Sequence, residues 1–119
     1  MKINLVREIS ERNFGGEVLQ ASQPVLVGFL ADWSKPCQVV LPILEEIADS
    51  YEGKTKVLKV NVDDNPDLAN VYGVQSVPTL IYFIHGTVRL KIVGMISAKA
   101  ILAKLESLTK GITPNEEPK

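Results

Sequence analysis

The chain contains very little cysteine: Cys37 is the only one among its 119 residues. A single thiol cannot close an internal disulfide or build a multi-cysteine metal site, and it is compatible with a reducing compartment. We therefore expect no structural disulfide, no metal and no other cofactor. Any redox chemistry would need a second thiol from another molecule.

The sequence also lacks an excess of charge of either sign and any long hydrophobic run. Its 13 basic and 14 acidic residues give a net charge of -1, which leaves no electrostatic footprint for nucleic acid or an anionic membrane surface. No segment reaches the roughly 20 apolar residues of a membrane span, and the first residues lack the apolar core of a signal peptide. We expect a cytoplasmic protein whose partner is neither nucleic acid nor membrane.

What is present is the pattern of one globular domain. The chain is 45% hydrophobic and 23% charged, within the usual range for a single core. Residues 24–31 form a continuous apolar run, as expected for a central strand buried on both faces. Residues 36–51 carry apolar side chains three and four apart, which predicts a long helix that Pro42 kinks and Gly53 ends.

Shorter elements precede and follow these two. The residue patterns predict strands over residues 2–6 and 56–62, a frayed helix over residues 8–22 weakened by Gly15-Gly16, and a short helix from Pro66, capped by Asn65 and ended by Gly73. Residues 79–84 and 87–93 are joined only by His85-Gly86, a connection so short that it forces an antiparallel hairpin. The sheet is therefore mixed.

The end of the chain completes the expected organisation. Ser97 can cap a last amphipathic helix, and the polar, proline-containing residues after that helix are typical of a disordered tail. We expect one domain over residues 1–110 and a tail over residues 111–119. The order of elements predicts an α/β fold with a central mixed β-sheet of about five strands flanked by about four helices.

Four motifs stand in order along the chain. They are Ala-Asp-Trp-Ser-Lys-Pro-Cys at residues 31–37, Val-Asn-Val-Asp-Asp-Asn-Pro at 60–66, Tyr-Gly-Val-Gln-Ser-Val-Pro-Thr at 72–79 and Val-Gly-Met at 93–95. They resemble the active-site segment of the thioredoxin family, the strand and turn after its active-site helix, the segment with its cis proline, and the loop that completes its binding surface. The resemblance spans about residues 3–110 and implies a thioredoxin fold.

The first motif departs from the family at its reactive positions. The resemblance places Ser34 at the attacking cysteine, Lys35 at a usual glycine, and Cys37 at the second, more buried cysteine. A hydroxyl needs a base to replace a thiolate, and the one histidine, His85, would lie roughly 20 Å away at the far end of its strand. We therefore predict that Ser34 caps the long helix, and that the chain is no autonomous dithiol reductase.

Two further positions bear on Cys37. In the family a buried aspartate beneath this cysteine assists proton transfer, and the matching position here is Gly28. Lys59 stands where the family has the lysine that neighbours this aspartate. Two interpretations of Lys59 stay open: its ammonium extends to solvent from a buried stem, or it lies near Cys37 and favours the thiolate.

The binding surface, by contrast, matches the family's groove. The resemblance implies that an extended peptide lies there against the backbone before a cis proline, whose position here is Pro78. The matching residues are Trp33, Pro36, Val77, Pro78, Gly94 and Met95. Trp33 could instead serve only in packing. Lys35 could bias the groove toward acidic or glutathione-like partners, or lie freely in solvent.

Two functions agree with these residues. The first, which we favour, is a non-enzymatic binding module that holds a peptide or protein partner in the groove near Trp33 and Pro78. The second is thiol-disulfide exchange in cell redox homeostasis through Cys37 alone, with a mixed disulfide to glutathione or to a partner that supplies the resolving thiol. We expect a monomer in either case.

Overall fold

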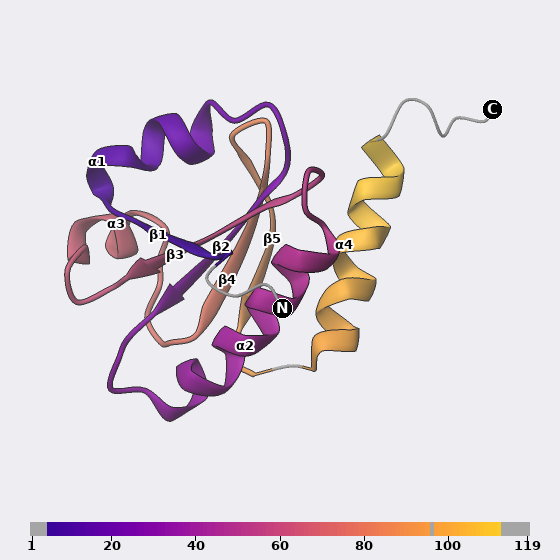
Figure 1. The fold of residues 1–119 in the computed structure, drawn as a ribbon. Helices are drawn as coiled ribbons and strands as arrows, with labels where there is room; N and C mark the ends of the chain where they lie inside the picture. The colour runs from indigo at the N-terminus through magenta and orange to yellow at the C-terminus, as the bar shows by residue number, and fades with distance from the viewer. Residues whose placement is uncertain (1–4, 96, 113–119) are drawn as a thin grey trace.

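The computed structural model describes residues 5–95 and 97–112, and these residues form a five-stranded sheet with helices on both faces (Figure 1). The elements are β1 (Arg7–Ile9), α1 (Glu11–Phe14), a π-helical turn η1 (Gly15–Leu19), β2 (Val25–Leu30), α2 (Lys35–Ser50), β3 (Lys56–Asn61), α3 (Pro66–Val71), β4 (Thr79–Ile84), β5 (Thr87–Val93) and α4 (Ala98–Ile112). No helix of the described residues is long and apolar enough to cross a membrane.

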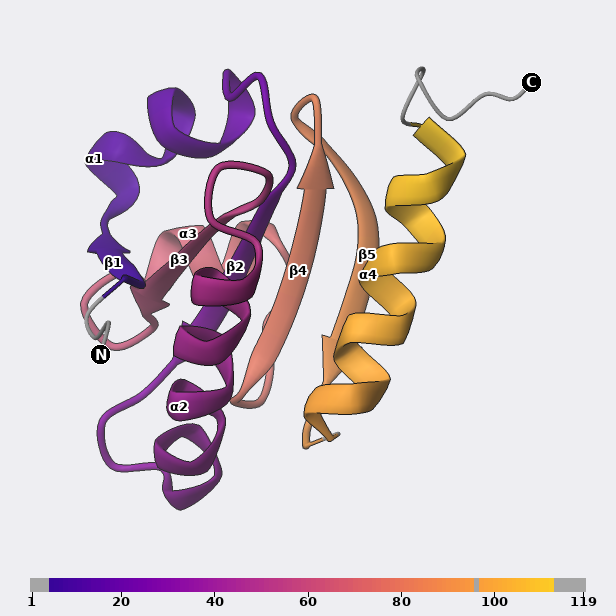
Figure 2. The ribbon, with the colours of Figure 1, turned by 45° about the vertical axis from the view of Figure 1, so that its right-hand side comes forward.

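The sheet has the strand order β1-β3-β2-β4-β5 and is mixed. Strands β1, β3 and β2 run parallel, whereas β4 is antiparallel to both β2 and β5. Helices α2 and α4 pack on one face, and α1 with α3 packs on the other (Figure 2). The predicted α/β fold is thereby confirmed.

Strand β2 lies at the centre of both apolar layers, and all six of its residues are buried. Because successive side chains of a strand point to opposite faces, Leu26 and Leu30 join the layer under α2 and α4, while Val27 and Phe29 join the layer under α1 and α3. The continuous apolar run predicted this burial on both faces.

The start of the chain differs from its prediction. A strand was expected over residues 2–6, but the first strand is Arg7–Ile9, which pairs with β3. The N–H groups of Leu5 and Val6 donate instead to the carboxylate of Glu45 in α2, at 2.8 and 3.3 Å. A side-chain acceptor therefore holds these two residues, and the rest of the predicted strand lies outside the described residues.

The first helix is shorter than the predicted span of residues 8–22. It begins at Glu11, because Ser10 and Asn13 form a capping box: the N–H of Arg12 donates to Ser10 Oγ, and Asn13 Oδ1 accepts from the N–H of Ser10. The α-helix gives way to the π-helical turn at Gly15, and this turn ends at Leu19.

The helix after β3 was predicted correctly in its position, but its cap is different. It begins at Pro66 and ends before Gly73, whose φ of 66° is left-handed. Asn65 occupies the cap position without a side-chain bond to α3. Its Oδ1 accepts instead from the N–H of Glu11, at 3.0 Å, and Glu11 Oε2 accepts from the N–H of Leu68, at 3.2 Å. The two helices thus cap each other.

The remaining elements follow their predictions closely. Helix α2 contains Pro42, although the kink expected there stays a prediction. His85 and Gly86 both have positive φ, 52° and 77°, as a type I′ hairpin turn requires. Ser97 Oγ accepts from the N–H of Ala100, and the helix that it caps extends to Ile112, past the boundary expected at residue 110. The predicted tail beyond this helix lies outside the described residues.

Candidate functional site

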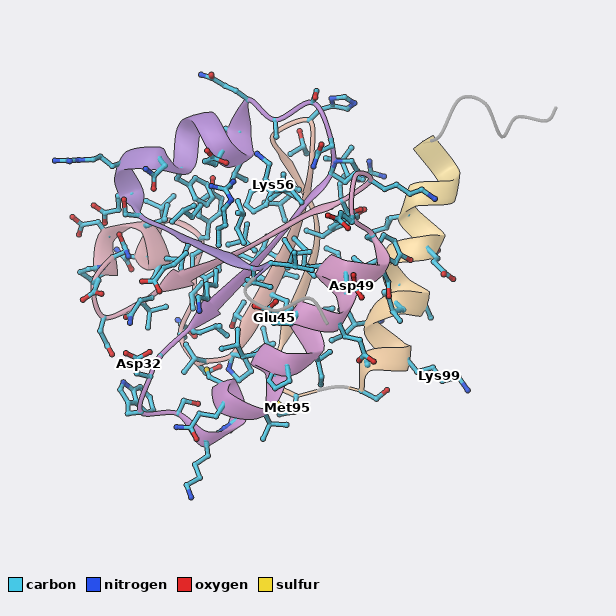
Figure 3. The ribbon with its side chains drawn as sticks, in the orientation of Figure 1. Asp32, Glu45, Asp49, Lys56, Met95 and Lys99 are labelled. Carbon is cyan, nitrogen blue, oxygen red and sulfur yellow. The ribbon has the colours of Figure 1, made fainter. Side chains whose placement is uncertain are left out.

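Strand pairing brings the candidate residues to one edge of the sheet. Phe29 of β2 lies beside Thr79 of β4, and Thr79 lies beside Val93 of β5. The segments that follow β2, precede β4 and follow β5 therefore leave the sheet at the same edge. Figure 3 shows Asp32 and Met95 at this end of the molecule, near the first turn of α2.

Ser34 is the N-terminal cap of α2, as predicted. Its Oγ accepts a hydrogen bond from the N–H of Cys37 at 3.2 Å, and its own N–H donates to the Ala31 carbonyl at 3.2 Å. Ser34 is only 4% exposed. The hydroxyl therefore satisfies one of the free N–H groups at the start of the helix, and among the described residues its Oγ makes no hydrogen bond to a base that could activate it.

Cys37 lies inside the first turn of α2, and it is also only 4% exposed. Its Sγ accepts a hydrogen bond from the N–H of Ala31 at 3.4 Å. Thiol chemistry requires an accessible sulfur. This sulfur is almost fully buried and accepts from a backbone donor.

A small cleft of about 110 Å³ passes beside Cys37 on the side that faces β1 and β3. Glu8, Gln38 and Lys59 contribute to its walls. Lys59 is half-buried on β3, in register with Glu8 of β1 on one side and Gly28 of β2 on the other. Within the described part of the chain its side chain forms no hydrogen bond or ion pair, so it lines the same cleft as Cys37 without bonding to it.

The space above Gly28 is filled by an apolar side chain. A Cβ atom built on Gly28 would lie 2.8 Å from Leu44 Cδ1, and Leu44 is fully buried in α2. Contacts of this length force neighbouring atoms to move, which is destabilising in a packed core. A side chain added at Gly28 would therefore have to displace the tip of Leu44.

Trp33 is the aromatic residue of the candidate binding surface. It is 69% exposed, so packing does not explain it. Its indole Nε1 donates to Asp63 Oδ2 at 2.9 Å, which holds the ring at the mouth of the site. Met95, on the loop after β5, is 43% exposed, and Lys35 and Pro36 are exposed in the first turn of α2. This end of the molecule therefore presents exposed apolar side chains beside one lysine.

The backbone before β4 forms the other wall. The Val77–Pro78 peptide bond is cis, as the resemblance implies. The Pro78 carbonyl accepts from the N–H of Gly94 at 2.9 Å, and the Ser76 carbonyl accepts from Thr79 Oγ1 at 2.7 Å. Between these anchors, the N–H and C=O groups of Val77 have no hydrogen-bond partner among the described residues. They are available to another chain.

Sequence reasoning missed the role of Asp63. The only signal was its place just after β3, whose carboxyl end adjoins that of the parallel strand β2 and hence Trp33. It also gave no sign of Thr79 as an anchor of the loop. Among the described residues, no group of three or more His, Cys, Asp or Glu side chains is arranged to hold a metal ion.

Comparison with known proteins agrees with the fold. The thioredoxin family model matches residues 5–107. Thioredoxin 1 of Nostoc sp. is 43% identical over 99 residues, which cover 83% of this chain and 92% of that protein. The thioredoxins of Synechocystis sp. and Pseudomonas aeruginosa are 41% and 40% identical over 99 residues each, with the same coverage. The motif-based resemblance is confirmed, and this chain belongs to the thioredoxin family.

Proposed function

We propose that this protein is a binding module that holds an extended peptide or protein segment in the thioredoxin groove, without a dithiol reductase cycle. One contrast carries the proposal: Cys37 is 4% exposed, whereas Trp33, at the same end of α2, is 69% exposed. The molecule presents its aromatic surface and covers its sulfur. A cytoplasmic location is part of the proposal, because a single unpaired thiol is typical of a reducing compartment. The proposal also includes a monomeric state.

The chemistry of the groove suits a peptide backbone. The free N–H and C=O groups of Val77 can pair with an extended segment as a further strand would, and such main-chain bonds supply affinity with little dependence on sequence. Trp33, fixed through Asp63, offers the apolar anchor that supplies much of the binding energy in many interfaces. The exposed Lys35 favours a partner with an acidic group near this anchor.

A reductase cycle fails at two steps in this chain. An attacking thiolate must form a mixed disulfide, and a second thiol of the same protein must then release the reduced substrate. Position 34 has a hydroxyl engaged in capping, and Cys37 has no second thiol with which to close a disulfide. The chain can therefore pass no electron pair through an internal disulfide.

The test is partner capture from cell extract by wild type, Cys37→Ala and Trp33→Ala, each with and without strong reductant. Cys37→Ala should retain its partners, whereas Trp33→Ala should lose them, because removing a large aromatic anchor typically costs about 2 kcal/mol or more, roughly thirtyfold in affinity. Val88→Ala is the matched control, since Val88 is an exposed apolar residue near the hairpin turn, away from the groove.

The second candidate is thiol-disulfide exchange through Cys37, with glutathione or a partner thiol. The cleft beside Cys37 favours it, because Lys59 on its wall could attract a small anionic thiol such as glutathione. It predicts the opposite ranking: partners would be lost with Cys37→Ala or under reductant, and retained with Trp33→Ala. That result would replace the binding-module proposal.

A further inference from the structure

We infer that Lys91 is a positioning residue of the groove, which ties the loop at residues 73–78 to β5 and so fixes the backbone that an extended peptide would meet. The inference rests on the proposed function. It assigns to an exposed lysine of β5, outside every motif of the binding surface, a role in preparing that surface.

The argument begins at the end of α3. The N–H of Gly73 donates to the Asn70 carbonyl at 3.0 Å, and the N–H of Val74 donates to the Ala69 carbonyl at 2.9 Å. With Gly73 at positive φ, these two bonds form a Schellman motif, which stops the helix. They leave the carbonyls of Tyr72 and Gly73 beyond the reach of the helix's own N–H groups.

Lys91 supplies the missing donor. Its Nζ donates to the Tyr72 carbonyl at 3.0 Å and to the Gly73 carbonyl at 3.1 Å. Its neighbour Ile92 is buried in the layer under α2 and α4, so Lys91 points to the opposite face, where α3 lies. A cation at this place also complements the partial negative charge at the end of a helix.

The same strand holds the other end of the loop. Three residues after Lys91, the N–H of Gly94 donates to the Pro78 carbonyl at 2.9 Å. The loop is thus anchored to β5 at its start by a side chain and at its finish by the backbone. Val77, with its unpaired N–H and C=O groups, lies between these anchors. Losing the first anchor frees the backbone that must be ordered for binding, and ordering it again weakens binding.

The experiment compares wild type with Lys91→Met, which keeps the length of the side chain and removes its donors. Lys91→Arg is the conservative variant that should restore the bonds to the carbonyls. Arg89→Met is the matched control, because Arg89 is an exposed cation on the same strand, and its side chain forms no hydrogen bond or ion pair among the described residues. The first readout is amide hydrogen exchange at the bonded N–H groups of Gly73 and Val74, measured without any ligand.

Exchange at Gly73 and Val74 should rise about fivefold in Lys91→Met, the factor that corresponds to a typical net hydrogen bond, while β2 and β4 remain as in wild type. Lys91→Arg should be close to wild type, and Arg89→Met should show no change. Unchanged exchange at Gly73 and Val74 in Lys91→Met would overturn the inference. So would an equal rise throughout the sheet, which a merely stabilising residue would produce.

The second readout is affinity for a cysteine-free peptide selected on the wild-type protein from a display library, measured by calorimetry under reductant. Lys91→Met should bind it about fivefold more weakly, with recovery in Lys91→Arg. Equal affinity, or a loss without faster loop exchange, would overturn the inference. Failure to select any peptide would contradict the proposed function instead, and the exchange measurement would still decide whether Lys91 orders the loop.

Discussion

At position 34, a single oxygen atom stands where the family resemblance places the reactive sulfur. Ser34 Oγ lies in the first turn of α2 and accepts from the N–H of Cys37 at 3.2 Å. A side chain at this position therefore points toward Cys37 without any rearrangement of the helix. Restoring a thiol here tests whether the rest of the site still supports redox chemistry.

We predict that wild-type protein shows no reduction of protein disulfides by a small dithiol above background. Ser34→Cys should form an internal disulfide with Cys37, because the helix turn supplies the geometry, and it should give slow turnover. The measurements are a thiol titration after mild oxidation and a disulfide-reduction assay. Ser34→Ala is the control, expected to lose about 1 kcal/mol of stability with the cap and to gain no activity. Robust turnover by wild type would contradict the prediction.

Gly28 shows why the second missing group is harder to restore. The resemblance suggested that a carboxylate is simply absent there, but Leu44 occupies the space, with Cδ1 only 2.8 Å from a Cβ at residue 28. Gly28→Asp would crowd Leu44 and place a charge in an apolar layer. The sequence alone gave no sign that Leu44 is the neighbour of Gly28.

At the scale of elements, α1 and α3 are joined by an exchange of caps. Asn65 is buried on α3, and its Oδ1 bonds to the first N–H of α1, while Glu11 of α1 bonds to the N–H of Leu68 in α3. Two helices that are each shorter than two turns gain little stability by themselves. The exchange holds both against the sheet.

We predict that Asn65→Ala lowers the free energy of unfolding by about 1–3 kcal/mol, because it leaves buried backbone groups without partners. Its Nδ2 also donates to the Asn61 carbonyl at 2.9 Å, so the substitution removes a bond at each end of its amide. Urea denaturation gives the measurement. Asn70→Ala, an exposed asparagine in the same helix, should change the stability by less than about 0.5 kcal/mol. Equal effects of the two substitutions would show that the exchanged caps contribute nothing.

The bounds of some elements were predicted from the sequence more accurately than those of others. The apolar spacing of α2 and the run of β2 are set by burial, so their ends were predicted within a residue or so. The first strand was misplaced because Glu45 of α2 binds the N–H groups of Leu5 and Val6. The edge strand begins instead at the charged residues Arg7 and Glu8. Pairing at the edge of a sheet depends on the neighbouring strand more than on propensity.

At the scale of the whole molecule, Glu17 links three segments that are distant in sequence. Its carboxylate accepts from Arg7 of β1 at 2.8 Å and from Lys56 of β3 at 3.1 Å. Two hydrogen bonds lower the pKa of Glu17 below its ordinary value of 4.5, and the one from Arg7 has a larger effect than the one from Lys56. The charged form of Glu17 is therefore favoured in the folded protein.

The sign of the pH dependence follows from this shift. A carboxyl whose pKa is lower in the folded state contributes stability that is present above its unfolded pKa and is lost as the pH falls through the folded value. We predict that stability falls more steeply below about pH 4.5 in wild type than in Glu17→Gln. Denaturation at a series of pH values measures this difference. Glu46→Gln, at an exposed glutamate of α2, is the control, and parallel curves for wild type and Glu17→Gln would contradict the prediction.

The candidate site was predictable where it depends on the order of motifs. Parallel and antiparallel pairing places Trp33, Pro78 and Met95 at one edge once the strand order is known. Three other features depend on three-dimensional geometry that no spacing in the sequence encodes. They are the hydrogen bond from Trp33 to Asp63, the unpaired backbone groups of Val77 and the burial of Cys37. Lys59 lies on the wall of the cleft beside Cys37, and both interpretations of its role stay predictions.

The hydroxyl at position 34 also has a kinetic consequence. A thiolate there would join protein and partner by a covalent bond, and release would wait for a second chemical step. With Ser34 in the cap and Cys37 covered, the proposed complex has no such step, so its residence time is set by the dissociation rate alone. Partners would exchange at the same speed in reducing and oxidising surroundings. Occupancy of the groove would then follow the concentration of free partner and would not follow the thiol potential of the cell.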